Sequence, residues 1–230
     1  MYRERMSELA GAVVWTVTRT ADAGSGRVLP DGCMDLIWSS RSGLLVAGPD
    51  TVAQVAAGPA GERYVGLRLP PGVGPAVFGL PAHELRDQRI PLGALWPAPE
   101  VAALAERVAL HDRPGRLLES TAADRLAAGG GPDPIAAPLA AGLAAGRDVA
   151  GAADALGLGA RQLHRRSLVL FGYGPKTLAR ILRMRRALAL ARSGTPAAEV
   201  AVRTGYADQA HLSREVRSLA GVPLRQLVDS

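Results

Sequence analysis

The feature that most restricts the fold of this chain is a weak internal repeat near its C-terminal end. The repeat contains small, apolar, glycine and proline residues in one order. These are Ala153, Gly157, Leu158, Leu163, Leu170, Gly172 and Pro175 in the first copy and Ala201, Gly205, Tyr206, Leu212, Leu219, Gly221 and Pro223 in the second. Each copy predicts two helices that cross at a small residue, a tight turn at a glycine with positive φ, and a Gly–Pro stop. The sequence therefore predicts two helix-turn-helix units.

The surrounding residues predict that this part of the chain is entirely helical. Asp133 and Pro134 are expected to cap and open the first helix, and Thr195 and Asp208 to cap the last two, because each side chain can accept hydrogen bonds from free backbone N–H groups. After the first helix, the predicted helices cover residues 149–156, 160–170, 176–191, 196–204 and 208–220, of which the last two are those capped by Thr195 and Asp208. The helix over 176–191 is long enough to join the two units.

The first half of the chain has a different pattern. Between residues 13 and 78, short apolar runs alternate with Gly, Pro, Asp and Ser, which predicts strands and turns in a small barrel or sandwich. The runs are "AVVWTV", "MDLIW", "LLVAG", "YVGLRL" and "PAVFGL". Helical spacing follows, with two helices divided near "DRPGR".

The best linker is "AAGGGPDP", residues 127–134, and the domain boundary is expected there. The prediction is an α+β chain. Residues 1–130 would form a β-barrel-like domain with trailing helices, for sensing an effector or for dimerisation. Residues 131–230 would form an all-α DNA-binding domain with two helix-turn-helix units.

The distribution of charge indicates a partner for the second half only. Residues 1–130 hold 13 basic and 14 acidic residues, whereas residues 131–230 hold 14 basic and 7 acidic ones. A local positive excess favours a polyanion such as double-stranded DNA. The N-terminus lacks the apolar run of a signal peptide and no uncharged apolar stretch reaches membrane-span length, so the expectation is a cytoplasmic protein without a membrane partner.

The second helix of each unit has an outer face suited to reading DNA. Leu212, Val216 and Leu219 have the spacing of a buried stripe, as do Leu163 and Leu170. The outer residues are Arg161, His164 and Arg165 in the first unit and Gln209, Ser213, Arg214 and Arg217 in the second. Arginine and short or planar hydrogen-bonding side chains can read base edges in the major groove. A solvated basic face would look similar, but the matched positions in two units favour base reading.

Residues 133–228 resemble the AraC/XylS-type DNA-binding domain of bacterial transcription factors. The resemblance is carried by "LGLGARQLHRR…FGYGPKTLARILRMRRALAL" and most specifically by "AAEVAVRTGYADQAHLSREVRSLAGVPLRQL". It implies two recognition helices in successive major grooves, with the outer residues above as base readers. Ser167 and Val216 stand where the family prefers Phe, which predicts a looser first core, and Ala210 stands where some members have a polar base contact. The linker-helix residues Arg180, Arg183, Arg185 and Arg186 are expected to contact phosphate or solvent.

Residues 10–110 resemble the uncharacterised N-terminal sensing domain of AraC-type regulators, through "LPDGCMDLIW", "AGPDT" and "GLRLPPGVGPAVFGLPAHELRDQRIPL". The resemblance implies an effector-responsive regulator whose N-terminal half binds a small molecule or pairs two subunits. Cys33, Trp38, Tyr64 and Arg68 are the candidate effector-binding residues. The helices between Ala98 and Ala128 are the candidate seam of a homodimer, and RNA polymerase would be a further partner of an activator.

An alternative function is a chemical sensor or enzyme-like N-terminal domain that uses Cys33 and is addressed to DNA by the basic half, since an exposed thiolate near arginine is reactive. A lone cysteine is more often a small buried apolar residue. A third possibility is an N-terminal half that only dimerises. No catalytic arrangement, cofactor or metal is expected, because His83 with Glu84 and His111 with Asp112 lack further spaced ligands.

Overall fold

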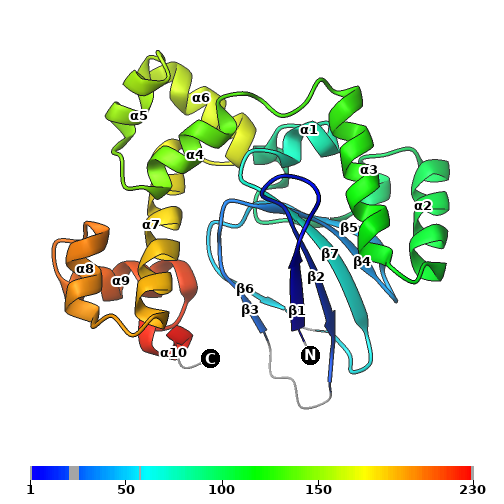
Figure 1. The fold of residues 1–230 in the computed structure, drawn as a ribbon, viewed down its shortest axis with the longest axis horizontal. Coiled ribbons are helices and arrows are strands. Elements are labelled where there is room, and N and C mark those ends of the chain that lie inside the picture. The colour runs from blue at the N-terminus through cyan, green and yellow to red at the C-terminus, as the bar shows by residue number, and fades with distance from the viewer. Residues whose placement is uncertain (1, 21–25, 57, 229–230) are drawn as a thin grey trace.

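The protein has an N-terminal half of strands and helices and a C-terminal half of helices (Figure 1). The structure is a computed structural model, and it describes residues 2–20, 26–56 and 58–228. The predicted α+β fold class is confirmed.

A six-stranded antiparallel sheet organises the N-terminal half, in the order β1-β2-β7-β4-β5-β8, and β3 pairs with β6 in a separate two-stranded sheet. The strands are β1 (Tyr2–Met6), β2 (Val13–Thr18), β3 (Gly26–Val28), β4 (Met34–Ser39), β5 (Gly43–Ala47), β6 (Gln54–Ala56), β7 (Arg63–Leu69) and β8 (Arg89–Pro91). In the described residues β1 and β8 are the edges of the larger sheet and do not pair with each other, so this sheet is open.

The two faces of the large sheet differ because alternate residues of a strand point to opposite sides. Leu36 and Trp38 of β4 and Val65 and Leu67 of β7 are buried in the N-terminal core. Helix α3 (Pro114–Ala128) packs against this side of β7, and Figure 1 shows α1 and α3 at this side of the sheet. The opposite face carries Asp35 and Ile37 of β4 and Tyr64, Gly66 and Arg68 of β7.

The run "PAVFGL" was predicted as a strand, and this prediction was wrong. Residues Gly74–Phe78 form the short helix α1, which has Pro75 in its first turn and ends at Gly79 with φ of 83°. Proline early in a helix and a left-handed glycine after it are strong helix boundaries. A short apolar run alone does not separate strand from buried helix.

The remaining N-terminal helices agree with the predicted pair divided near "DRPGR". They are α2 (Ala98–Leu110) and α3, preceded by the 3-10 turns η1 (Ala82–Leu85) and η2 (Leu92–Ala94). Glu119 of α3 is buried and accepts two hydrogen bonds from the Arg5 guanidinium of β1, at 3.0 and 2.7 Å. This pair joins α3 to the edge of the sheet.

The C-terminal half contains the predicted helices and one more. They are α4 (Ala136–Ala144), α5 (Val149–Ala155), α6 (Ala160–Phe171), α7 (Pro175–Arg192), α8 (Ala197–Thr204), α9 (Gln209–Ala220) and the unpredicted α10 (Leu224–Val228). Figure 1 shows α7 as the long helix that connects the α4–α6 group with the α8–α10 group.

Two of the three expected N-caps are not used. Pro196 occupies the N-cap of α8 without a side-chain hydrogen bond, so Thr195 does not cap it. The N-cap of α4 is Ile135, and the Asp133 carboxylate instead binds the Arg166 guanidinium and accepts from the Ile135 N–H. Asp208 does cap α9, because its Oδ1 accepts from the His211 N–H at 2.6 Å.

Buried apolar residues form two clusters, one for each half. The N-terminal cluster lies between the sheet and its helices, and the C-terminal cluster lies among α4–α10. The predicted boundary at residues 130 and 131 falls between α3 and α4, while Leu29 of the first half packs against the C-terminal cluster. Among the described residues, no helix has the length and apolar character needed to cross a membrane.

Candidate nucleic-acid interface

The first candidate recognition helix is α6, which follows α5 through a turn at Gly157. Gly157 has φ of 63°, a conformation that glycine adopts without strain. Leu163 and Leu170 face the C-terminal core, as their spacing predicted. Ser167, which stands where the family prefers Phe, is also fully buried. Its hydroxyl donates a hydrogen bond to the Tyr173 carbonyl at 2.8 Å, so this buried polar group has a partner.

The second candidate recognition helix is α9, which follows α8 through Gly205 at φ of 76°. Leu212, Val216 and Leu219 form its buried stripe, as expected. The turn is further ordered by His211, whose ring meets the Tyr206 ring edge-on with centroids 5.2 Å apart.

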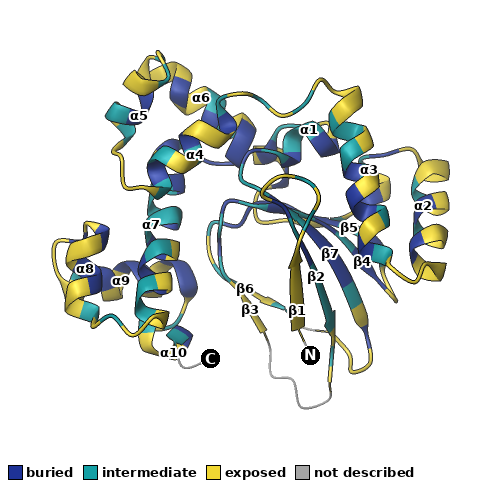
Figure 2. Ribbon diagram, viewed as in Figure 1, coloured by how far each residue is buried: buried dark blue, intermediate teal, exposed yellow. Residues whose placement is uncertain are grey.

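The predicted readers of both helices lie on the exposed side. Figure 2 shows exposed and buried residues alternating along both helices. The exposed set comprises Arg161, His164, Arg165, Gln209, Ser213, Arg214 and Arg217. Arg165 and Arg214 each lie two residues after the fully buried leucines Leu163 and Leu212, so the two arginines occupy equivalent places.

The linker-helix arginines have partners inside the protein. Arg180 and Arg183 both bind the Glu215 carboxylate of α9, at 3.1 and 2.7 Å. The Arg183 guanidinium also lies 4.5 Å from the centre of the Tyr206 ring, and Arg186 donates to the carbonyls of Ala144 and Thr204. Arg180, Arg183 and Arg186 thus have internal partners, whereas Arg185 is exposed. The contacts of these arginines with phosphate stay a prediction.

Glu215 was missed by sequence reasoning although it is the centre of this network. Burial alone would raise the pKa of its carboxyl, but the hydrogen bonds from Arg183 and Arg180 outweigh burial and lower the pKa. The sequence did contain a sign of this role, because Glu215 lies between the exposed Arg214 and Arg217 and directly before the buried Val216.

The candidate effector residues are divided between the two faces of the sheet. Trp38 is buried in the N-terminal core, whereas Arg68 and Tyr64 lie on the opposite face. A single site formed by Cys33, Trp38, Tyr64 and Arg68 is therefore not supported, because Trp38 is taken up by core packing.

Arg68 is instead the centre of a polar cluster on the non-core face. Its Nε lies 3.5 Å from Asp31 and 3.7 Å from Asp35. Trp15 Nε1 donates to Asp35 at 2.6 Å, and its ring lies over Gly66, where a Cβ would come within 2.1 Å. Burial raises the pKa of Asp35 to about 6, although Arg68 opposes this.

Cys33 adjoins this cluster in an environment that disfavours a thiolate. Burial raises the pKa of its thiol, and the negative charges of Asp31 and Asp35 raise it further. Because the thiolate is the reactive form, these surroundings suppress the nucleophilic chemistry of the alternative function.

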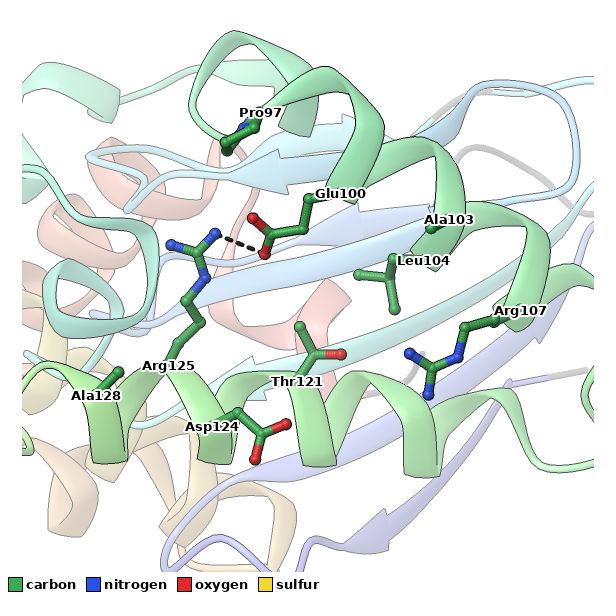
Figure 3. A pocket seen from close by; sticks show the side chains of 9 residues that line it. All are labelled: Pro97, Glu100, Ala103, Leu104, Arg107, Thr121, Asp124, Arg125 and Ala128. Atoms are coloured by element: carbon green, nitrogen blue, oxygen red, sulfur yellow. Dashed lines mark hydrogen bonds and ion pairs between the residues drawn. The ribbon is translucent and has the colours of Figure 1, made fainter.

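A separate cavity of about 560 Å³ lies between α2 and α3 (Figure 3). The Arg125 guanidinium binds Glu100 at 2.7 Å and lies 3.9 Å from the centre of the Trp96 ring. Arg107 extends from α2 toward α3, and Thr121 and Asp124 line the other wall. None of the four candidate effector residues lines this cavity.

Comparison with known proteins agrees with the helical arrangement. Residues 152–230 match a family described as a helix-turn-helix domain, and residues 9–91 match a domain of unknown function, DUF6597. The protein is therefore a DNA-binding transcriptional regulator. More specifically, it carries an AraC-type helix-turn-helix domain behind a DUF6597 domain.

No curated protein matches the chain. Solved structures of ToxT from Vibrio cholerae are similar over nearly the whole chain. An apo ToxT variant from strain SCE256 is 12% identical with a TM-score of 0.48, and covers 95% of this chain and 96% of its own. ToxT from strain O395 is 10% identical with a TM-score of 0.47, covering 94% and 96%. Wild-type ToxT bound to an unsaturated fatty acid is 12% identical with a TM-score of 0.46, covering 94% of each chain.

Proposed function

We propose that α6 and α9 are two recognition helices that read successive major grooves of one operator. The observation that carries this proposal is the equivalence of Arg165 and Arg214, which are exposed at the same place in two repeated units. Helix α7 has 18 residues, which corresponds to about 27 Å at about 1.5 Å per residue. This length suits recognition helices in grooves one turn of DNA apart, roughly 34 Å.

The proposed base-reading residues are Arg161, His164 and Arg165 in α6 and Gln209, Ser213, Arg214 and Arg217 in α9. Arginine can form two hydrogen bonds with guanine, and glutamine can do so with adenine. Residues 131–230 would form this DNA-binding domain. We also propose that two copies form a homodimer through α2 and α3. If the protein activates transcription, it would contact RNA polymerase as well.

The test is selection of bound sequences from a random DNA pool by the full-length protein. We expect two information-rich blocks about 10 base pairs apart. Arg165→Ala should erase the preference in one block and Arg214→Ala in the other, each at a cost of about 1–3 kcal/mol on the preferred site. The control Arg203→Ala, which removes an exposed arginine of α8, should leave the motif unchanged. Equal losses on selected and random DNA would contradict the base-reading roles.

We further propose that the N-terminal half responds to an effector, through the polar cluster around Arg68. A carboxyl group with a raised pKa beside a half-buried arginine is typical of binding sites. A compound that changes the affinity for the selected DNA should lose this effect in Arg68→Met. A screen in which every compound leaves that affinity unchanged would favour a domain that only dimerises.

A further inference from the structure

The two candidate recognition helices end in the same way and at the same kind of contact. Gly172 follows α6 and Gly221 follows α9, both with positive φ, of 83° and 72°. They occupy equivalent places in the repeat. Each of these helix ends touches the N-terminal half of the protein, at two separate places on it.

The end of α6 fits closely against η1, the residue after it, and Pro49 just after β5. Arg86 Nη1 donates to the Gly172 carbonyl at 3.3 Å. A Cβ on Gly172 would lie 2.6 Å from Pro49 Cγ and 3.2 Å from the Ala82 carbonyl, so only glycine permits this approach. The neighbouring Phe171 is fully buried, and its ring lies against Gly72, where a Cβ would come within 2.9 Å.

The end of α9 is held by residues beside the small β3–β6 sheet. The Ala53 N–H donates to the Leu219 carbonyl at 2.7 Å, and Arg27 Nη1 donates to the Ala220 carbonyl at 3.0 Å. The last carbonyls of a helix have no partner within it and form the negative end of its dipole. Arginine and a backbone N–H therefore complete a helix end that would otherwise depend on water.

We propose that Arg27, Ala53 and Arg86 are positioning residues that hold the two recognition helices at one separation, so that the N-terminal half determines which spacing of DNA blocks the protein reads. The proposal rests on the function proposed above. Helix α7 is one connection between the two units. The N-terminal half supplies a second, because η1 and its neighbours bind the end of α6 while residues at the β3–β6 sheet bind the end of α9.

The contacts at the end of α6 leave the DNA-reading surface of that helix free. The candidate readers of α6 lie in its N-terminal half, from Arg161 to Arg165, whereas Phe171 and Gly172 make the contact at its other end. Recognition helices commonly insert their N-terminal residues into the groove. The contact at the end of α6 can therefore fix the position of this helix without blocking the residues that would contact bases.

The experiment measures dissociation constants of full-length protein for its selected site and for sites in which the two blocks are moved apart or together by single base-pair steps. The variant is Arg27→Ala/Arg86→Ala, which removes two exposed side chains. We expect the affinity ratio between the best and the shifted sites to fall by about fivefold or more, as a lost coupling between sites predicts.

The matched control is Arg41→Ala/Arg63→Ala, which removes the same charge from two exposed arginines of the first half. These arginines lie outside the two helix-end contacts and outside α2 and α3, the proposed dimer seam. This control should keep the wild-type affinity ratio. Arg27→Ala alone should also lower the affinity ratio, and this single variant replaces the double variant in the test if the double variant does not fold.

The outcomes separate the two proposals. A two-block site in the wild type with an unchanged ratio in both variants would overturn the positioning role alone. A wild-type protein that selects no two-block site would contradict the proposed function and this inference together. A lowered ratio in the variants but not in the control supports the positioning role.

Discussion

Glu119 is a buried carboxylate whose charge is stabilised by donors from the first residues of the chain. Arg5 donates to both oxygens, and the Glu8 backbone N–H donates to Oε1 at 3.1 Å. Burial alone would raise the pKa of Glu119, but these bonds and one from Ser7 lower it to about 2. The ionised form is therefore more stable in the folded protein than in the unfolded chain.

Glu119→Gln should lower the free energy of unfolding at pH 7 by about 2 kcal/mol, because a lowered pKa represents stability gained on ionisation. The folded pKa lies below the ordinary value of about 4.5, so this stability is present above that pH and is lost as the pH falls toward 2. Urea unfolding of wild type and variant between pH 7 and pH 2.5 would measure a shrinking difference. The control Glu8→Gln removes an exposed carboxylate and should cost less than about 0.5 kcal/mol. A difference that stays constant with pH would contradict the ionic origin.

At the scale of elements, α7 organises the C-terminal half by binding α9 through charge as well as through apolar contacts. Glu215 of α9 accepts from two arginines of α7 that are one turn apart, and Arg183 also covers the Tyr206 ring. The second candidate recognition helix is thereby fixed to the linker helix. The arginines of α7 contribute to the basic charge of this half while serving a structural role.

Glu215→Gln should lower the free energy of unfolding by about 1–3 kcal/mol, because a buried charged acceptor is lost while its arginines stay partly buried. Thermal unfolding followed by circular dichroism measures this. Glu199→Gln is the matched control, since it breaks an exposed pair with Arg203 within α8 and should cost about 0.5 kcal/mol or less. Equal losses in the two variants would show that burial of Glu215 adds nothing.

The sequence predicted elements best where a period of 3.6 residues continued over several turns. Leu163, Leu170, Leu212 and Leu219 are buried as predicted, because a helix repeats its face regularly. Short elements such as α1, α10 and the strands β1, β3, β6 and β8 escaped prediction, since a few residues do not establish a period.

Side-chain partners were the least predictable part. The sequence predicted Arg183 and Arg186 to contact phosphate or solvent, and it contained nothing about their partners Glu215, Ala144 and Thr204, which come from other elements. Similarly, the strand pattern did not assign Trp38 to the core face and Arg68 to the other. The roles of the exposed reader residues remain predictions.

At the scale of the whole molecule, two clusters of buried residues are joined by contacts that cross between the halves. Leu29 packs on the C-terminal cluster, and Gly72 and Gly32 approach Phe171 and Leu178 closely. The small domain size of each half makes such shared burial valuable, because a short chain buries a smaller fraction of its surface. The net positive charge stays in the second half, whereas the first half supplies the arginines at the helix ends.

The contacts at the two helix ends also bear on the order in which the protein is made. Arg27, Ala53 and Arg86 all precede residue 130, so the ribosome releases the complete sheet domain before α9 has been synthesised. Domains generally fold as units during synthesis, starting with the N-terminal one. The finished first half can then act as a template on which the end of α6 settles first and the end of α9 second. The nascent chain would thus acquire its helix spacing during translation, before it encounters DNA.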